Sequence, residues 1–192
     1  MPHTQPELTL CHAATSQLII VDVQERLATS MPKRDLDVVI ANINRLSKAA
    51  DLLDIPVIVT EQYPKGLGPT IDAVRDHLPA DLEPLQKTGF STCSASGFEQ
   101  RLTHDETRKQ IILVGIEAHI CVLQTASGLQ HWGYQVFVAA DGVCSRTPAN
   151  RDNGLARMRQ SGIQITNAES VAFEWMGDAT HERFKEVAAL FK

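Results

Sequence analysis

A chain of 192 residues is long enough for one domain with a sizeable core, and its hydrophobic (43%) and charged (21%) fractions are ordinary for a globular protein. The formal net charge of −5, without a run of Lys and Arg, argues against nucleic-acid binding. No apolar stretch approaches the roughly 20 residues of a transmembrane helix, and the N-terminal sequence lacks the pattern of a secretory signal. We therefore expect a cytoplasmic protein without a membrane or nucleic-acid partner.

Apolar runs of strand type alternate with segments of helical periodicity. The expected strands are residues 17–23, 57–60, 110–115, 135–141 and 163–166, and the expected helices are residues 35–54, 70–78, 96–105, 119–131, 148–162, 168–176 and 181–191. Asp35 and Ser96 are the expected N-caps of their helices, and Pro148 suits a first helical turn. The Pro- and Gly-rich segment 61–86 is otherwise predicted to be loop.

Strands that alternate with helices predict a mostly parallel sheet covered by helices on both faces. Without a repeat, a low-complexity tract or a linker, we expect one domain over residues 1–192. Ligands bind beyond the carboxyl ends of the strands in such sheets. The search for a site therefore starts just after Val21, Thr60, Val114 and Ala140.

Asp22 and Cys121 are the first candidates at these strand ends. Asp22 follows the apolar "LIIV", where a carboxylate is either a turn-forming residue or a working acid or base. Cys121 falls near the expected start of a helix, where the helix dipole and free amides would favour a thiolate and could hold an oxyanion. It also lies on the core stripe of that helix, so a buried structural thiol is an equally open interpretation.

The other candidates depend on what lies beside them. Lys87 is an ordinary loop lysine unless it sits next to Asp22 and Cys121, where it would lower the thiol pKa. Tryptophans are expected to pack, and Asp141 is expected to form a turn. The four cysteines, Cys11, Cys93, Cys121 and Cys144, form no C-x-x-C pair and have no zinc-type partners, so neither a disulfide framework nor a structural metal is predicted.

Six motifs in order resemble the isochorismatase-like cysteine hydrolase superfamily, most closely its isochorismatase domain-containing subgroup. They are "LIIVDVQ", "VTEQYPKGLG", "KTGFS", "LVGIEAHICVLQTA", "VAADGVCSR" and "ARMRQSG", and they span about residues 18–162. The resemblance implies a three-layer α/β/α fold with a six-stranded, mostly parallel sheet. It also implies self-association, so we expect a homo-oligomer.

The same resemblance implies the site. Carried over by motif, Asp22, Lys87 and Cys121 form a catalytic triad, and the peptide between Ile116 and Glu117 is cis. The amides of Glu117 and Cys121 then form an oxyanion hole. The candidate residues of the substrate pocket are Gln62, Tyr63, Phe90 and His119.

The implied reaction is acyl transfer from a small carboxamide or related acyl compound, through a thioester on Cys121 and with no cofactor. The Asp-x-His metal cluster of nicotinamidases is missing after the second strand, so we expect no zinc. The alternative is a non-catalytic interaction domain that retains the fold. A dinucleotide-binding domain is excluded, because "DVQERLA" follows the first strand in place of G-x-G-x-x-G.

Overall fold

The computed structural model describes residues 9–102 and 108–192. Within these residues, six parallel strands form one sheet in the order β3-β2-β1-β4-β5-β6. The strands are β1 (Ser16–Val21), β2 (Val57–Gln62), β3 (Leu85–Lys87), β4 (Gln110–Ile116), β5 (Gln135–Cys144) and β6 (Gln164–Thr166). The strand order reverses between β1 and β4, and such a switch point opens a crevice at the carboxyl ends of the strands.

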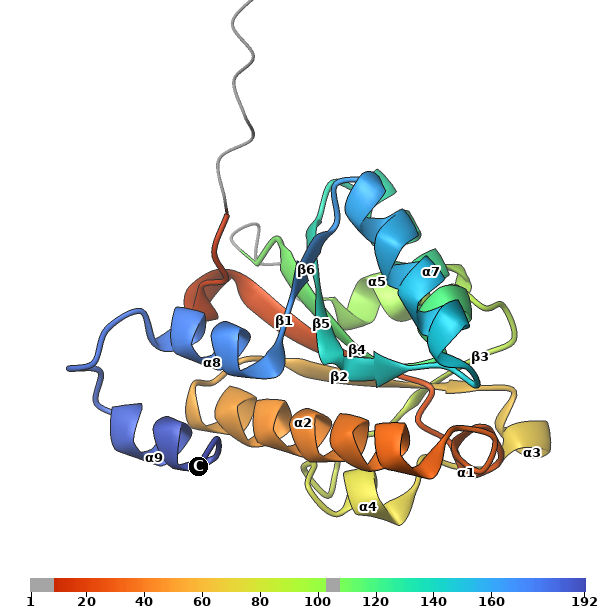
Figure 1. Cartoon of the computed structure of the whole chain (residues 1–192), viewed down its shortest axis with the longest axis horizontal. Coiled ribbons are helices and arrows are strands. Elements are labelled where there is room, and N and C mark those ends of the chain that lie inside the picture. The colour runs from red at the N-terminus through yellow and green to blue at the C-terminus, as the bar shows by residue number, and fades with distance from the viewer. Residues whose placement is uncertain (1–8, 103–107) are drawn as a thin grey trace, which may run out of the picture.

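Helices cover both faces of the sheet (Figure 1). On one side lie α2 (Lys33–Leu52), α8 (Ala168–Met176) and α9 (Phe184–Ala189), and on the other α5 (Phe98–Arg101), α6 (Leu123–His131) and α7 (Pro148–Gln160). The short elements are η1 (Ala13–Thr15), α1 (Glu25–Ala28), α3 (Pro64–Leu67), α4 (Asp72–Arg75), η2 (Thr92–Ser94) and the π-helical turn η3 (Ala118–Val122). The expected three-layer α/β/α fold is confirmed.

The two hydrophobic cores follow from the alternation of side chains along buried strands. Leu18 and Ile20 of β1 pack in the core under α2 and α8, whereas Ile19 and Val21 pack in the core under α6 and α7. All four side chains are fully buried. This is why the strand sequence is continuously apolar rather than alternating.

Several local predictions were wrong. Helix α2 begins at Lys33, so Asp35 lies in the first turn and is not the N-cap. Helix α5 covers only Phe98–Arg101 after Gly97, and no side chain caps it, Ser96 included. The rest of that expected helix, residues 103–105, lies outside the described residues. Strand β3, which holds Lys87, was not predicted, because three residues after a Pro-rich segment carry no periodic signal.

The bend at the end of β4 places the elements that follow it. Pairing with β5 shifts register between Leu113 and Gly115, and the peptide between Ile116 and Glu117 is cis. Gly115 has φ +120°, and a Cβ there would stand 2.1 Å from the carbonyl oxygen of Val21. Only glycine allows β1 and β4 to approach this closely.

We expect Gly115→Ala to lower the free energy of unfolding by about 3 kcal/mol or more, because backbone strain and steric overlap add. Gly133→Ala is the matched control. Gly133 also has a positive φ, +85°, but a Cβ there would meet no atom within 4 Å, so strain alone should cost about 1–2 kcal/mol. Urea denaturation of both variants measures the difference, and equal losses would contradict the close-approach explanation.

Candidate active site

Three side chains that the sequence singled out meet beyond the carboxyl ends of the strands. Asp22 directly follows β1, Lys87 ends β3, and Cys121 lies in η3 after β4. All three are at most 5% exposed. They are 34 to 99 residues apart in the chain, and the parallel sheet brings them together at its switch point.

The carboxylate of Asp22 is fixed at both oxygens. Thr60 Oγ1 donates to Asp22 Oδ1 over 2.7 Å, and Lys87 Nζ lies 2.6 Å from Asp22 Oδ2. The backbone of Asp22 is left-handed, with φ 51°, and its N–H donates to the carbonyl of Thr60. The chain thus turns the carboxylate towards the interior immediately after the strand.

The ammonium of Lys87 is fully buried with several acceptors around it. Besides Asp22, Lys87 Nζ donates to Gln62 Oε1 at 2.9 Å, to the Phe90 carbonyl at 3.0 Å and to the Gly89 carbonyl at 3.3 Å. A buried charge is tolerated only when it is paired and hydrogen-bonded, and this one is both. Sequence reasoning missed Thr60 as a partner, although its place at the end of a strand was a signal.

The thiol of Cys121 lies within the influence of the Asp22 and Lys87 charges, and its ionisation is unfavourable in the substrate-free protein. Burial and, next, the charge of Asp22 raise the pKa of Cys121 to about 12, against the opposing effect of Lys87. The expectation of a resting thiolate was therefore wrong. Helix α6 starts only at Leu123, after the π-helical turn that contains Cys121, so the thiol is not in the first turn of that α-helix.

A cavity of about 330 Å³ gives access to Cys121. Its lining includes the predicted pocket residues Gln62 and Phe90, together with Glu117 and Arg146. Tyr63 instead lines a separate hollow beside Lys65 and Ser94. His119 is not part of the Cys121 cavity lining, and its Nδ1 lies 3.0 Å from Ser145 Oγ.

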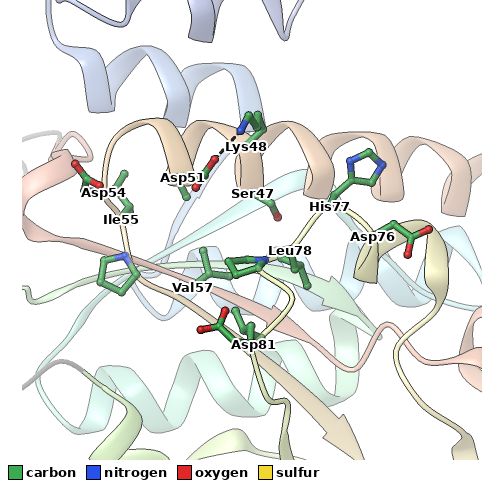
Figure 2. A pocket seen from close by; sticks show the side chains of 14 residues that line it. Ser47, Lys48, Asp51, Asp54, Ile55, Val57, Asp76, His77, Leu78 and Asp81 are labelled. Carbon is green, nitrogen blue, oxygen red and sulfur yellow. Dashed lines mark hydrogen bonds and ion pairs between the residues drawn. The ribbon is translucent and has the colours of Figure 1, made fainter.

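A larger cavity, of about 780 Å³, lies between the C-terminal half of α2 and the loop after α4 (Figure 2). Exposed acidic side chains dominate its rim, and Lys48 of α2 pairs with Asp51 over 2.6 Å. None of Asp22, Lys87 and Cys121 lines it. Its size therefore does not make it the candidate site.

The fold and this cluster define a doubly wound α/β protein with a buried carboxylate, ammonium and thiol at its switch point. The pattern of the isochorismatase domain matches residues 16–170, and the chain belongs to the isochorismatase family. Human isochorismatase domain-containing protein 2 is 38% identical over 192 residues, which cover 100% of this chain and 90% of the human protein. The family resemblance found in the sequence is thereby confirmed, and it indicates a hydrolase.

Solved structures agree with the fold. A structure described as the MAR1 ribonuclease of Caenorhabditis elegans has a TM-score of 0.87 and 37% identity, covering 95% of this chain and 92% of that one. The YcaC gene product of Escherichia coli, described as an octameric hydrolase of unknown specificity, has a TM-score of 0.85 at 23% identity, covering 98% and 91%.

Neither a membrane-spanning helix nor a metal-binding cluster is found among the described residues. No helix there combines the length and the apolar character needed to cross a bilayer. Over residues 9–102 and 108–192, no three His, Cys, Asp or Glu side chains gather in a way that could hold a metal ion.

The raised pKa predicts how Cys121 reacts with alkylating agents. Because the folded-state pKa lies above the ordinary value of 9.0, the neutral thiol dominates at pH 7 and the thiolate fraction rises roughly tenfold per pH unit. Iodoacetamide labelling of Cys121, followed by peptide mass spectrometry, should therefore accelerate throughout pH 7–10. A rate that levels off below pH 8 would show a resting thiolate.

Removing one partner of the buried ion pair should be costly. Lys87→Met leaves the carboxylate of Asp22 buried without its cation, and we expect a loss of about 3–5 kcal/mol in the free energy of unfolding. Adding Asp22→Asn removes the unpaired charge, so the double variant should lose less than the sum of the two single variants. Denaturant titrations of the four proteins measure this coupling, and strictly additive losses would argue against it.

Proposed function

We propose that this protein is a cofactor-free cysteine hydrolase that cleaves a small carboxamide or a related acyl compound. The observation that carries the proposal is the buried ion pair of Asp22 with Lys87, whose charges both act on the neighbouring Cys121 thiol. A thiol next to a fixed carboxylate is a nucleophile next to a general base. The cavity of about 330 Å³ that ends at this thiol suits a small substrate.

In the first half of the reaction, Cys121 attacks the carbonyl carbon while its proton passes to Asp22. The Sγ–C bond forms, and the electron pair of the C=O bond moves to the oxygen, where the amides of Glu117 and Cys121 stabilise it. When the tetrahedral intermediate collapses, the C–N bond breaks and Asp22 returns the proton to the leaving amine. The product that stays bound is a thioester on Cys121.

In the second half, Asp22 takes a proton from water, and the resulting hydroxide attacks the thioester carbonyl. The C–S bond breaks, the acid product leaves, and the proton returns to the sulfur. Lys87 does not exchange protons in this scheme. Its ammonium holds the carboxylate of Asp22 in place between the two steps.

The alternative function is an interaction domain without catalysis. A domain used only as a scaffold gains nothing from a buried ion pair beside a thiol, because an apolar replacement of similar volume is often as stable. RNA, which the name of the nematode relative suggests, is disfavoured as a substrate by the net charge of −5. These considerations favour a small acyl substrate.

We also propose that the protein acts as a homo-oligomer. The E. coli relative is described as octameric. The C-terminal helices of this chain expose apolar surface, including Phe173 of α8, which is 38% exposed. Light scattering of the purified protein tests this part of the proposal.

The test of the function is a screen of small amides with wild-type protein and Cys121 variants. Cys121→Ala should abolish turnover, and Cys121→Ser should reduce it by at least about 10³-fold, because a hydroxyl is far harder to ionise than a thiol. Cys93→Ser is the matched control, since Cys93 lies outside the cavity lining and should tolerate the change. Amine or ammonia release is the readout.

Near-normal turnover by Cys121→Ser on a substrate that the wild type cleaves would disprove the nucleophile. A wild-type protein that hydrolyses no amide or ester of the screen, but binds another protein through this face, would favour the scaffold.

A further inference from the structure

Glu117 presents a carboxylate oxygen to the Cys121 cavity that the proposed mechanism does not use. The residue is only 5% exposed and lies in the cavity lining. Its Oε2 accepts from the backbone N–H of Arg146 at 2.9 Å and from Arg146 Nε at 3.1 Å. Among the described residues nothing donates to Oε1, and Oε1 is not one of the unpartnered atoms sealed from solvent. Because Glu117 lines the cavity, this oxygen is free to accept a hydrogen bond from a molecule bound there.

Besides Arg146, whose Nε is held by Glu117, the other polar side chains of the cavity are already engaged. Gln62 accepts from Lys87 through Oε1 and donates to the Thr88 carbonyl through Nε2, and the Ser30 hydroxyl donates to the Arg26 carbonyl. Most of the remaining lining is apolar, namely Leu27, Met31, Leu67, Phe90 and Ile120. Glu117 Oε1 is thus the side-chain acceptor that a bound molecule meets in an otherwise apolar wall.

The charges of the site also cancel. Lys87 neutralises Asp22, and Arg146 neutralises Glu117. A substrate that carries a carboxylate would meet two carboxylates, Asp22 and Glu117, each of which already has a partner cation. A neutral substrate with a hydrogen-bond donor meets no such penalty and satisfies Glu117 Oε1.

We propose that Glu117 determines specificity by accepting a hydrogen bond from the acyl part of the substrate. The substrate class is then an uncharged carboxamide that carries a hydroxyl or N–H donor a few atoms from the scissile carbonyl and lacks a carboxylate. Arg146 is the positioning residue, since its two donors hold Oε2 and turn Oε1 towards the cavity. This assignment rests on the proposed hydrolase function for the identity of the reacting group.

Glu117→Gln tests this assignment, because it should reverse the hydrogen-bonding preference of the cavity from donors to acceptors. The two donors of Arg146 will hold the amide oxygen of the new side chain, so its NH₂ group will face the cavity in place of Oε1. The acceptor becomes a donor, and Arg146 loses its counter-charge. Shape and volume barely change, and the backbone amide of residue 117 stays in place.

The probes are 3-hydroxypropanamide, its methyl ether 3-methoxypropanamide, which keeps the oxygen but lacks the donor, and succinamate, which carries a carboxylate. In the wild type, kcat/KM for the hydroxyl compound should exceed that for the ether by about 10–100-fold, as expected for a hydrogen bond to a charged group. In Glu117→Gln the ratio should fall to about one or invert, and succinamate should improve relative to both. Glu99→Gln, an exposed change of equal charge outside the cavity, should leave the ratios unchanged.

The same ratios are measured as dissociation constants in the Cys121→Ala background by calorimetry, which separates recognition from chemistry. A preference for the hydroxyl compound that Glu117→Gln removes supports the inference even if no amide is hydrolysed, in which case only the proposed reaction fails. If Glu117→Gln does not fold, as judged by its thermal midpoint, Arg146→Met replaces it, and there succinamate should weaken further. Unchanged ratios, or no binding of any of the three probes, would overturn the role of Glu117.

Discussion

The ion pair between Lys87 and Asp22 is the constraint around which the rest of the site is built. Two fully buried charges are tolerated only if every polar neighbour is in place. This requirement accounts for the short strand β3, which carries the lysine to the edge of β2, and for the loop after it, whose carbonyls at Gly89 and Phe90 face the ammonium. It also accounts for Thr60, which holds the second oxygen of Asp22 and prevents it from rotating away from the lysine.

The pair also explains why the thiol rests in its neutral form. The ammonium of Lys87 is paired directly with the carboxylate of Asp22. Its lowering effect on the pKa of Cys121 is therefore smaller than the raising effects of burial, which is the largest cause, and of the Asp22 charge. The substrate-free site therefore holds a neutral thiol beside a carboxylate, and not a thiolate. In the proposed reaction, the thiol gives up its proton only when a carbonyl carbon is in position to accept the sulfur. Cys11 and Cys144 are buried with raised pKa values as well, and Glu174 lies beside Cys11, but neither thiol lines the cavity that reaches Cys121.

Sequence patterns predicted those parts of the fold that local physics determines. Strand β1 is an uninterrupted apolar run and helix α8 has capped, periodic ends, and both were predicted to within about two residues. Lys87 was different, because a three-residue strand after four prolines has no period, and only the family motif placed the lysine beside Asp22. The residues that line the cavity could not be predicted from their positions after the strands either. Tyr63 has a left-handed backbone, with φ 37°, and lines a different hollow, which its position after a strand does not reveal.

The buried ion pair and the proposed recognition residues are held by different strands. Asp22, Lys87 and their partners belong to β1, β2 and β3, where each group is locked by several contacts, so a change there costs stability as well as chemistry. Glu117 and Arg146 follow β4 and β5, and the side chain of Arg146 is 56% exposed at the mouth of the cavity. A contact held by one half-exposed side chain can be altered without dismantling the ion pair. Substitutions in the walls after β4 and β5 should therefore alter the proposed recognition more readily than the buried pair.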